Sequence, residues 1–99
     1  MAARGKLYVV YGAGSDAVGL VQQITRPIAD AHANVVDMRQ DVLHGLFTLF
    51  MLVDLADSAL SAEQFRSLVA AIGEETGLSL AVDTYQPVPR RSDRRSLLV

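Results

Sequence analysis

The chain has 99 residues, 51% of them hydrophobic, and this length suits one domain with a single small core. It contains no cysteine, which excludes a disulfide framework, a thiolate metal site and a thiol nucleophile. Its two histidines, His32 and His44, fall on different predicted elements without ligand spacing, so we expect neither a metal site nor a cofactor. The first residues lead into too short an apolar run for a signal segment or a membrane span, so we expect a cytoplasmic protein.

Charge is divided unevenly along the chain. Residues 1–86 carry ten acidic and five basic side chains, a net −5, whereas residues 87–99 carry four arginines and one aspartate, a net +3. An acidic domain repels phosphate, so we expect no nucleic-acid partner for residues 1–86. Only residues 87–99, with their net positive charge, would attract nucleic-acid phosphates.

The first predicted strand, residues 7–11, runs into the glycine-containing stretch Gly12-Ala13-Gly14-Ser15-Asp16. We predict that these glycines let the backbone turn and that Asp16 caps the helix that follows. The free N–H groups at the amino end of a helix attract a carboxylate, so residues 16–20 form a candidate ligand loop. A plain strand-to-helix connection is the alternative interpretation.

The middle of the chain predicts a helix followed by a β-hairpin. Apolar side chains recur with helical spacing at Val21, Ile24, Ile28 and Ala31. The next strand, residues 35–43, alternates between an apolar side, Val36, Met38 and Val42, and a charged side, Asp37, Arg39 and Asp41. A two-residue turn at His44-Gly45 joins it to a strand over residues 46–53.

That third strand is apolar on both faces. Thr48, Phe50 and Leu52 alternate with a second row of apolar residues, Phe47, Leu49, Met51 and Val53. A strand without a polar face indicates that both of its sides are covered, and in so short a chain we expect a second copy to cover one of them. Protection by long side chains of neighbouring strands is the alternative.

The last elements complete a familiar plan. Ser61 and Gln64 form the signature of a capping box, the helix is predicted to end near Thr76 with Gly77 in the left-handed position, and residues 78–85 read as a fourth strand. The resulting order, βαββαβ, predicts an α+β ferredoxin-like sandwich, in which a four-stranded antiparallel sheet carries two helices on one face.

The remaining segment is expected to lie outside this domain. Residues 87–95 are proline-containing and charged, and we interpret them as a linker or tail. Residues 95–99 resemble the entry into the first strand, so residues 96–99 are either the start of a second, similar domain or a disordered end.

Several activities that occur on this fold in other proteins require residues that this chain does not have. The first loop has no thiol for a metal chaperone and no arginine to hold an acyl phosphate, and the third strand has no basic residue to accompany its aromatic ones for RNA binding. No Ser-His-Asp arrangement or carboxylate pair for acid-base catalysis stands out, and Asp37 and Asp41 are interpreted as solvated charges around Arg39. We therefore expect a chain that is not itself an enzyme.

Residues 6–86 resemble the ACT domain, an amino-acid-sensing regulatory module. The resemblance rests on Asp16 and Gly19 in the first loop, on Asn34-Val35 after the first helix, and on the hairpin strand that ends at Asp54. The family's loop usually reads Asp-x-Pro-Gly, and Val18 stands here at the proline position. Within the family the chain looks most like stand-alone proteins of the glycine-cleavage-repressor type and the N-terminal modules of phosphoserine phosphatases.

This resemblance implies a homodimer that binds an amino acid, such as serine or glycine, at its subunit interface. The implied ligand-binding residues are Asp16, Ala17, Val18, Gly19, Leu20, Asn34 and Val35. The loop N–H groups would receive the ligand carboxylate, and the Asn34 amide would bind its ammonium or polar side chain. The implied function is allosteric regulation; the alternatives are a regulatory N-terminal fragment of a phosphoserine phosphatase-like enzyme and a dimerisation module without a ligand.

Overall fold

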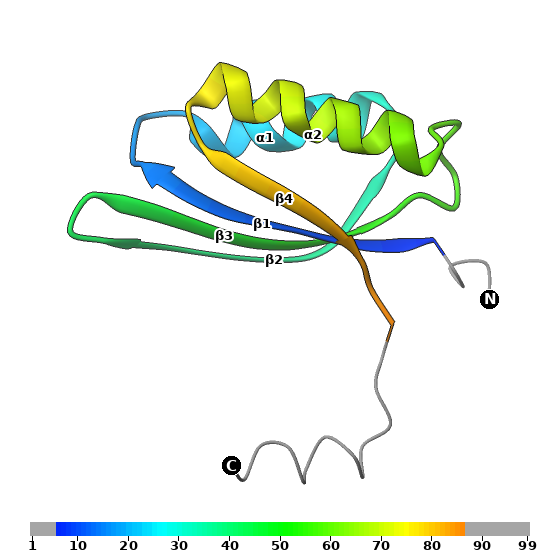
Figure 1. The fold of residues 1–99 in the computed structure, drawn as a ribbon, viewed down its shortest axis with the longest axis horizontal. Coiled ribbons are helices and arrows are strands. Elements are labelled where there is room, and N and C mark those ends of the chain that lie inside the picture. The colour runs from blue at the N-terminus through cyan, green and yellow to red at the C-terminus, as the bar shows by residue number, and fades with distance from the viewer. Residues whose placement is uncertain (1–5, 87–99) are drawn as a thin grey trace, which may run out of the picture.

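A computed structural model describes residues 6–86; the predicted linker 87–95 and the segment 96–99 lie outside the described residues. The elements are β1 (Leu7–Ser15), α1 (Leu20–Asp30), β2 (Asn34–Leu43), β3 (Leu46–Asp54), α2 (Ala62–Thr76) and β4 (Ser79–Thr84). The strands form one antiparallel sheet in the order β2-β3-β1-β4, and both helices lie on the same side of it (Figure 1). The predicted ferredoxin-like α+β fold is confirmed.

The core lies between the sheet and the two helices. Alternate residues of the two central strands face the helices, because successive side chains of a strand point to opposite faces. The central strands β1 and β3 and the helices α1 and α2 supply most of the buried side chains. These are Tyr8, Val10, Phe47, Leu49, Met51 and Val53 from β1 and β3, Leu20, Ile24 and Ile28 from α1, and Phe65, Val69 and Ile72 from α2. In α1 the fully buried stripe begins at Leu20, whereas Val21 and Ala31, which were expected to be buried, are only partly covered.

Helix α2 is closed at both ends as the sequence predicts. The Gln64 N–H donates to Ser61 Oγ at 3.1 Å, and the Ser61 N–H donates to Gln64 Oε1 at 2.8 Å, which completes the capping box. Gly77 follows the last helical residue with φ of 79°, in the left-handed region where glycine carries no steric penalty.

The β2–β3 hairpin also turns where it was predicted to turn. His44 and Gly45 both have positive φ, 51° and 82°, as the primed turns of two-residue hairpins require. This confirms the interpretation of His44 as a turn residue.

Strand β2 contains an irregularity that the alternation pattern did not predict. Val35 pairs with Val53 and Asp37 pairs with Leu52, so Val36 is the extra residue of a β-bulge. Val36 is therefore 51% exposed, and its assignment to the inner side together with Met38 was wrong. Val35 takes that inner position, where it packs against the core with Met38.

Two carboxylates occupy backbone donors along β2, which is an edge strand of the sheet. The Met38 N–H donates to Asp37 Oδ1 and the Val42 N–H donates to Asp41 Oδ1, each at 2.8 Å. Both aspartates are exposed and thus carry a local hydrogen bond in addition to their charge.

Candidate functional site

The loop between β1 and α1 is shorter than the glycine pattern indicated. Gly12 and Gly14 belong to β1, which continues to Ser15, so the prediction of a turn at these glycines was wrong. Their role is close approach to the neighbouring strand: a Cβ at Gly12 would overlap the Ser79 carbonyl oxygen, and one at Gly14 would lie 2.7 Å from Leu78 Cδ2. The loop proper is Asp16-Ala17-Val18-Gly19, and all four of its residues are exposed.

Helix α1 begins without a side-chain cap. The N-cap residue is Gly19, with φ of 82°, and no side chain bonds to the amino end of the helix. The prediction of Asp16 as N-cap was wrong, because the chain needs three more residues before it enters the helix; the Asp16 N–H instead donates to the Gly45 carbonyl at 2.9 Å. No acidic residue lies in the first turn, so the positive end of the helix dipole faces solvent without a charge partner on that turn.

Gly19 is open on all sides. A Cβ built at Gly19 has no heavy atom within 4 Å. Val18 beside it is 99% exposed, although it is a large apolar residue, and Leu20 is buried as the first residue of the helix. The loop therefore presents backbone and one apolar side chain to its surroundings.

The second implied segment, Asn34-Val35, lies at the other end of the sheet. Asn34 pairs with Asp54 and Asp54 pairs with Leu7, whereas the loop follows Ser15, which pairs with Leu46. Leu7 and Ser15 are eight residues apart on one strand, which corresponds to about 27 Å. Within one chain the loop and Asn34 do not meet.

Asn34 is an exposed residue with regular strand pairing. The residue in the left-handed conformation after α1 is His32, with φ of 63°, and not Asn34. Asn34 is the first residue of β2, so its amide is not needed for the turn that precedes it.

Sequence reasoning missed a second feature, on the sheet face that the helices leave open. Tyr11 stacks on Phe50 with ring centroids 5.7 Å apart, and Tyr11 Oη donates to Asp83 Oδ2 at 2.9 Å. This hydrogen bond, together with the negative charge of the Asp83 carboxylate, raises the pKa of Tyr11 above its ordinary value of 10.0. The alternation of residues 7–15 could have placed Val9 and Tyr11 on one face, but the contact with Asp83 depends on the register of β4.

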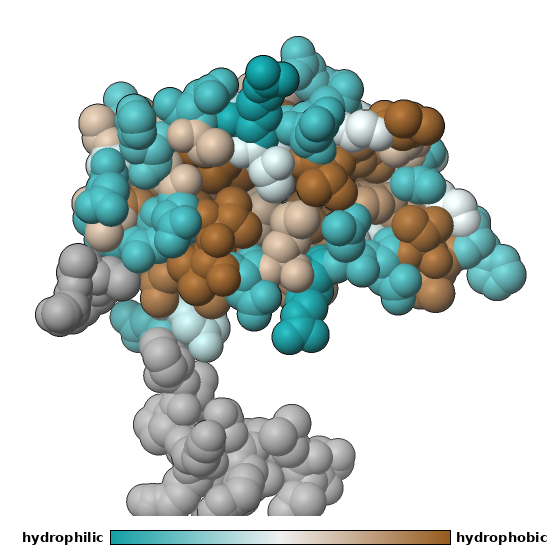
Figure 2. Space-filling model, turned by 180° about the vertical axis from the view of Figure 1, so that it is seen from behind, coloured by the Kyte–Doolittle hydropathy of each residue, from teal (hydrophilic) through white to brown (hydrophobic). Residues whose placement is uncertain are grey.

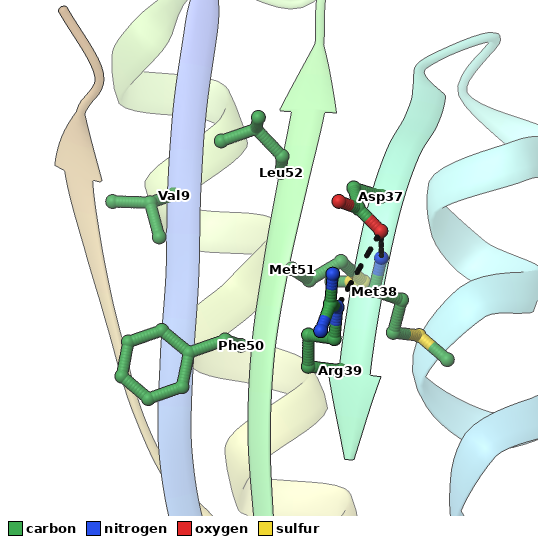
Figure 3. Close-up of a pocket in the computed structure, with 7 residues that line it drawn as sticks. All are labelled: Val9, Asp37, Met38, Arg39, Phe50, Met51 and Leu52. Atoms are coloured by element: carbon green, nitrogen blue, oxygen red, sulfur yellow. Dashed lines mark hydrogen bonds and ion pairs between the residues drawn. The ribbon is translucent and has the colours of Figure 1, made fainter. Parts of the chain in front are cut away.

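A shallow cavity of about 170 Å³ lies on this open face. Val9, Phe50 and Leu52 line its apolar part, and Asp37 and Arg39 stand beside it on β2, with 4.0 Å between Arg39 Nε and Asp37 Oδ1 (Figure 3). Phe50 is 59% exposed. The expectation that a second copy covers this side of β3 stays a prediction.

Apolar side chains are exposed at the hairpin as well, where Leu43 is 56% and Leu46 is 45% exposed. The rear view shows hydrophobic groups among hydrophilic ones, including a group at the right-hand end, where the hairpin projects (Figure 2). Among residues 6–86 no helix is long and apolar enough to cross a membrane.

Comparisons with known proteins agree with this fold. The family model of the ACT domain matches residues 7–82. The UPF0237 protein MK1213 of Methanopyrus kandleri is 36% identical over 85 residues, which cover 83% of this chain and 94% of that protein. An ACT domain protein from Streptococcus pneumoniae has the same fold, with a TM-score of 0.71 at 22% identity over 82% of this chain and 91% of that chain.

A candidate glycine cleavage system transcriptional repressor also shares the fold. It gives a TM-score of 0.71 at 20% identity, and the match covers 86% of this chain but only 48% of that chain. The family model, the sequence relatives and the fold agree, and the chain belongs to the ACT domain family.

Proposed function

We propose that this chain is a regulatory ACT domain that binds a free amino acid, with serine and glycine as the first candidates, in a site shared by two copies. The observation that carries this proposal is the position of the two implied segments at opposite ends of the sheet. A twofold axis perpendicular to the strands sets one end of a subunit beside the opposite end of its partner. The loop of one copy then meets Asn34 of the other, and each homodimer holds two equivalent sites.

The loop supplies the carboxylate-binding part of this site. The amino end of α1 has no side-chain cap and no acidic residue in its first turn, so its N–H groups and its dipole are available to an anion. Gly19 leaves room for the ligand to reach the backbone, because nothing lies within 4 Å of its Cβ position. Asp16, Ala17 and Val18 surround this approach, and Leu20 anchors it in the core.

Asn34 and Val35 of the partner supply the other half. The exposed Asn34 amide offers both a carbonyl oxygen for an ammonium group and an N–H donor for a polar side chain. Val35 is half-buried against the core and holds the backbone of Asn34 in place. Such a site recognises the ammonium and carboxylate groups that all free amino acids share.

The consequence of binding is regulation without catalysis. An amino acid that contacts both copies stabilises the dimer geometry in which its site is complete, and this shift is the signal to an attached or partner protein in the cytoplasm. Residues 87–95 are the proposed connection to such a protein.

The first test is thermal unfolding of the full chain at fixed concentration against a panel of free amino acids. Selective binding at 100 times the dissociation constant adds about 2.7 kcal/mol, which raises the unfolding temperature by several degrees in a domain of this size. A shift with one amino acid identifies the ligand. The absence of any shift while the homodimer is present would overturn the sensing function in favour of a dimerisation module.

Gly19→Leu tests the loop. The leucine fills the space above the backbone and should abolish the ligand-induced shift while the homodimer persists. Gly77→Leu is the matched control, because Gly77 has φ of 79° and an equally open Cβ position but lies at the end of α2. Loss of the shift in both variants would point to backbone strain rather than to a lost site.

A mixing experiment tests whether the site is shared. Gly19→Leu and Asn34→Ala should each fail to bind as homodimers. A mixed dimer contains one site with an intact loop from one chain and an intact Asn34 from the other, so mixing should recover ligand binding by part of the protein. If mixing recovers nothing, the site is not divided between copies in this way.

A further inference from the structure

We propose that the open face of the sheet is a second contact surface between copies of this chain, packed face to face about a twofold axis that crosses the strands. It uses the side of the sheet opposite to α1 and the ligand loop, so it goes beyond the amino-acid site and can be tested separately. The surface consists of two neighbouring rows of side chains, defined by the strand register. The first row is Arg39, Phe50, Tyr11 and Ala81, and the second row is Asp37, Leu52, Val9 and Asp83.

The centre of this surface is apolar. Val9, Tyr11, Phe50 and Leu52 occupy the two middle strands. Val9, Phe50 and Leu52 line the shallow cavity on this face (Figure 3). Phe50 leaves 59% of its surface in water. Val9, Tyr11 and Leu52 beside it are partly buried. A partly exposed group of large apolar side chains with a charged rim is typical of a protein contact surface.

The charges on the rim complement each other across one particular axis. Neighbouring rows are about 7 Å apart, because residues on one face are two positions apart. A twofold axis between the rows exchanges them, so Arg39 of one copy faces Asp37 of the other and the reverse. The same rotation sets Phe50 on Leu52 and Tyr11 on Val9 of the partner.

The remaining acidic groups also avoid one another in this arrangement. Asp83 faces Ala81 of the partner. In the two rows outside this surface, Asp41 faces Asn34 and Asp54 faces Thr48. A twofold contact between identical surfaces must satisfy every pair in both directions, and this one does so without placing like charges together.

Two other central axes set like charges together. An axis through the first row sets Arg39 on Arg39 and Asp37 on Asp41. An axis along the strands sets β2 on β4 and therefore Asp37 on Asp83. Because juxtaposed like charges disfavour a contact strongly, these two axes are excluded. An axis between the first row and the row of Asp41 also avoids like charges, but it sets Phe50 on Thr48 instead of on Leu52. Charge and apolar matching together select the axis between the two rows.

The expected contact is small. Four strands are about 19 Å wide and the two rows are about 14 Å long, which gives a footprint of about 270 Å² on each copy and leaves Asn34 outside it. This area places the contact among the weak, reversible ones, and the charge pattern supplies its specificity. We therefore expect association that depends on protein concentration.

Sedimentation of the full chain over a range of concentrations measures this association. Arg39→Asp sets a new carboxylate against Asp37 of the other copy, and Asp37→Arg sets two guanidinium groups against each other; each should weaken the face-to-face association by about tenfold or more. The double variant Arg39→Asp/Asp37→Arg exchanges the charges and should restore it. Arg26→Asp lowers the net charge as much as Arg39→Asp does, but on the exposed surface of α1, and should leave this association unchanged.

Equal association of the wild type and both single variants would overturn the proposal, and so would a double variant as weak as the single ones. A single-stranded RNA oligonucleotide tests the other occupant of a face with exposed aromatic rings. RNA binding that Phe50→Ser abolishes, in a chain that does not self-associate, would also overturn it. Failure here leaves the amino-acid shift intact, because the double variant keeps the loop and Asn34.

Discussion

Tyr11 on β1 and Phe50 on β3 lie directly opposite each other in the sheet, with their ring planes 15° from parallel. The Tyr11 hydroxyl continues this contact to Asp83 on β4, so one line of side-chain interactions crosses three strands on the face away from the helices. This line holds the rings side by side in the open face of the sheet.

The titration of Tyr11 should respond to Asp83. Because the neutral phenol donates to the carboxylate, the pKa of Tyr11 is raised in the folded chain, and the stability from this contact is complete below pH 10 and lost as pH rises through the folded pKa. Asp83→Asn should lower the pKa of Tyr11 toward its ordinary value. Tyrosinate absorbance, assigned by Tyr11→Phe, measures it, and an unchanged titration would contradict the contact.

Gly12→Ala should destabilise the domain by about 2–3 kcal/mol, because the new methyl group would overlap the Ser79 carbonyl on the neighbouring strand. Gly77→Ala is the comparison: its methyl group meets open space and only the left-handed backbone opposes it, at a cost of about 1 kcal/mol. Chemical denaturation gives both values. Equal losses would mean that β1 and β4 separate easily at Gly12.

The capping box of α2 should be measurable on its own. Ser61→Ala removes the acceptor of the Gln64 N–H and should cost about 1 kcal/mol of unfolding free energy. Gln64→Ala removes the reciprocal bond, and the double variant should cost less than the sum of the two because the bonds support each other. Strict additivity would argue against a cooperative box.

The bulge in β2 separates two adjacent valines. Val35→Asp places a carboxylate among core side chains and should cost about 1–3 kcal/mol, whereas Val36→Asp should change stability by no more than about 0.5 kcal/mol. Thermal unfolding of the two variants measures the difference. The opposite ranking would restore the regular alternation that the sequence suggested.

The features predicted correctly are those set by neighbours in the chain. The turn at His44-Gly45 and the capping box of Ser61 and Gln64 depend on a few adjacent residues, and their chemistry is local. The apolar spacing of α2 likewise needs no knowledge of its partner, and together these signals were sufficient for the order of elements and the fold class.

The predictions were wrong where the local structure depends on segments that are distant in the sequence. Gly12 has no room for a side chain because β4 lies close to it, and the sequence of residues 7–16 does not indicate that β4 pairs there. The Val36 bulge depends on pairing with β3, so strict alternation assigned the wrong valine to the core. The candidate ligand residues were taken from a family pattern, and the distance between Gly19 and Asn34 follows from the topology of the sheet.

The carboxylates of Asp37 and Asp41 also protect the edge of the sheet against pairing with a strand of another molecule. They occupy two backbone donors on an outer strand, and an added strand would have to displace them before it could pair there. Behind β2 lies β3, whose uncharged run from Leu46 to Val53 is the kind of segment that grows into fibrils when its backbone is accessible. The side chains of Asp37 and Asp41 therefore oppose the addition of further strands next to β2, and so protect the apolar strand β3 from fibril formation.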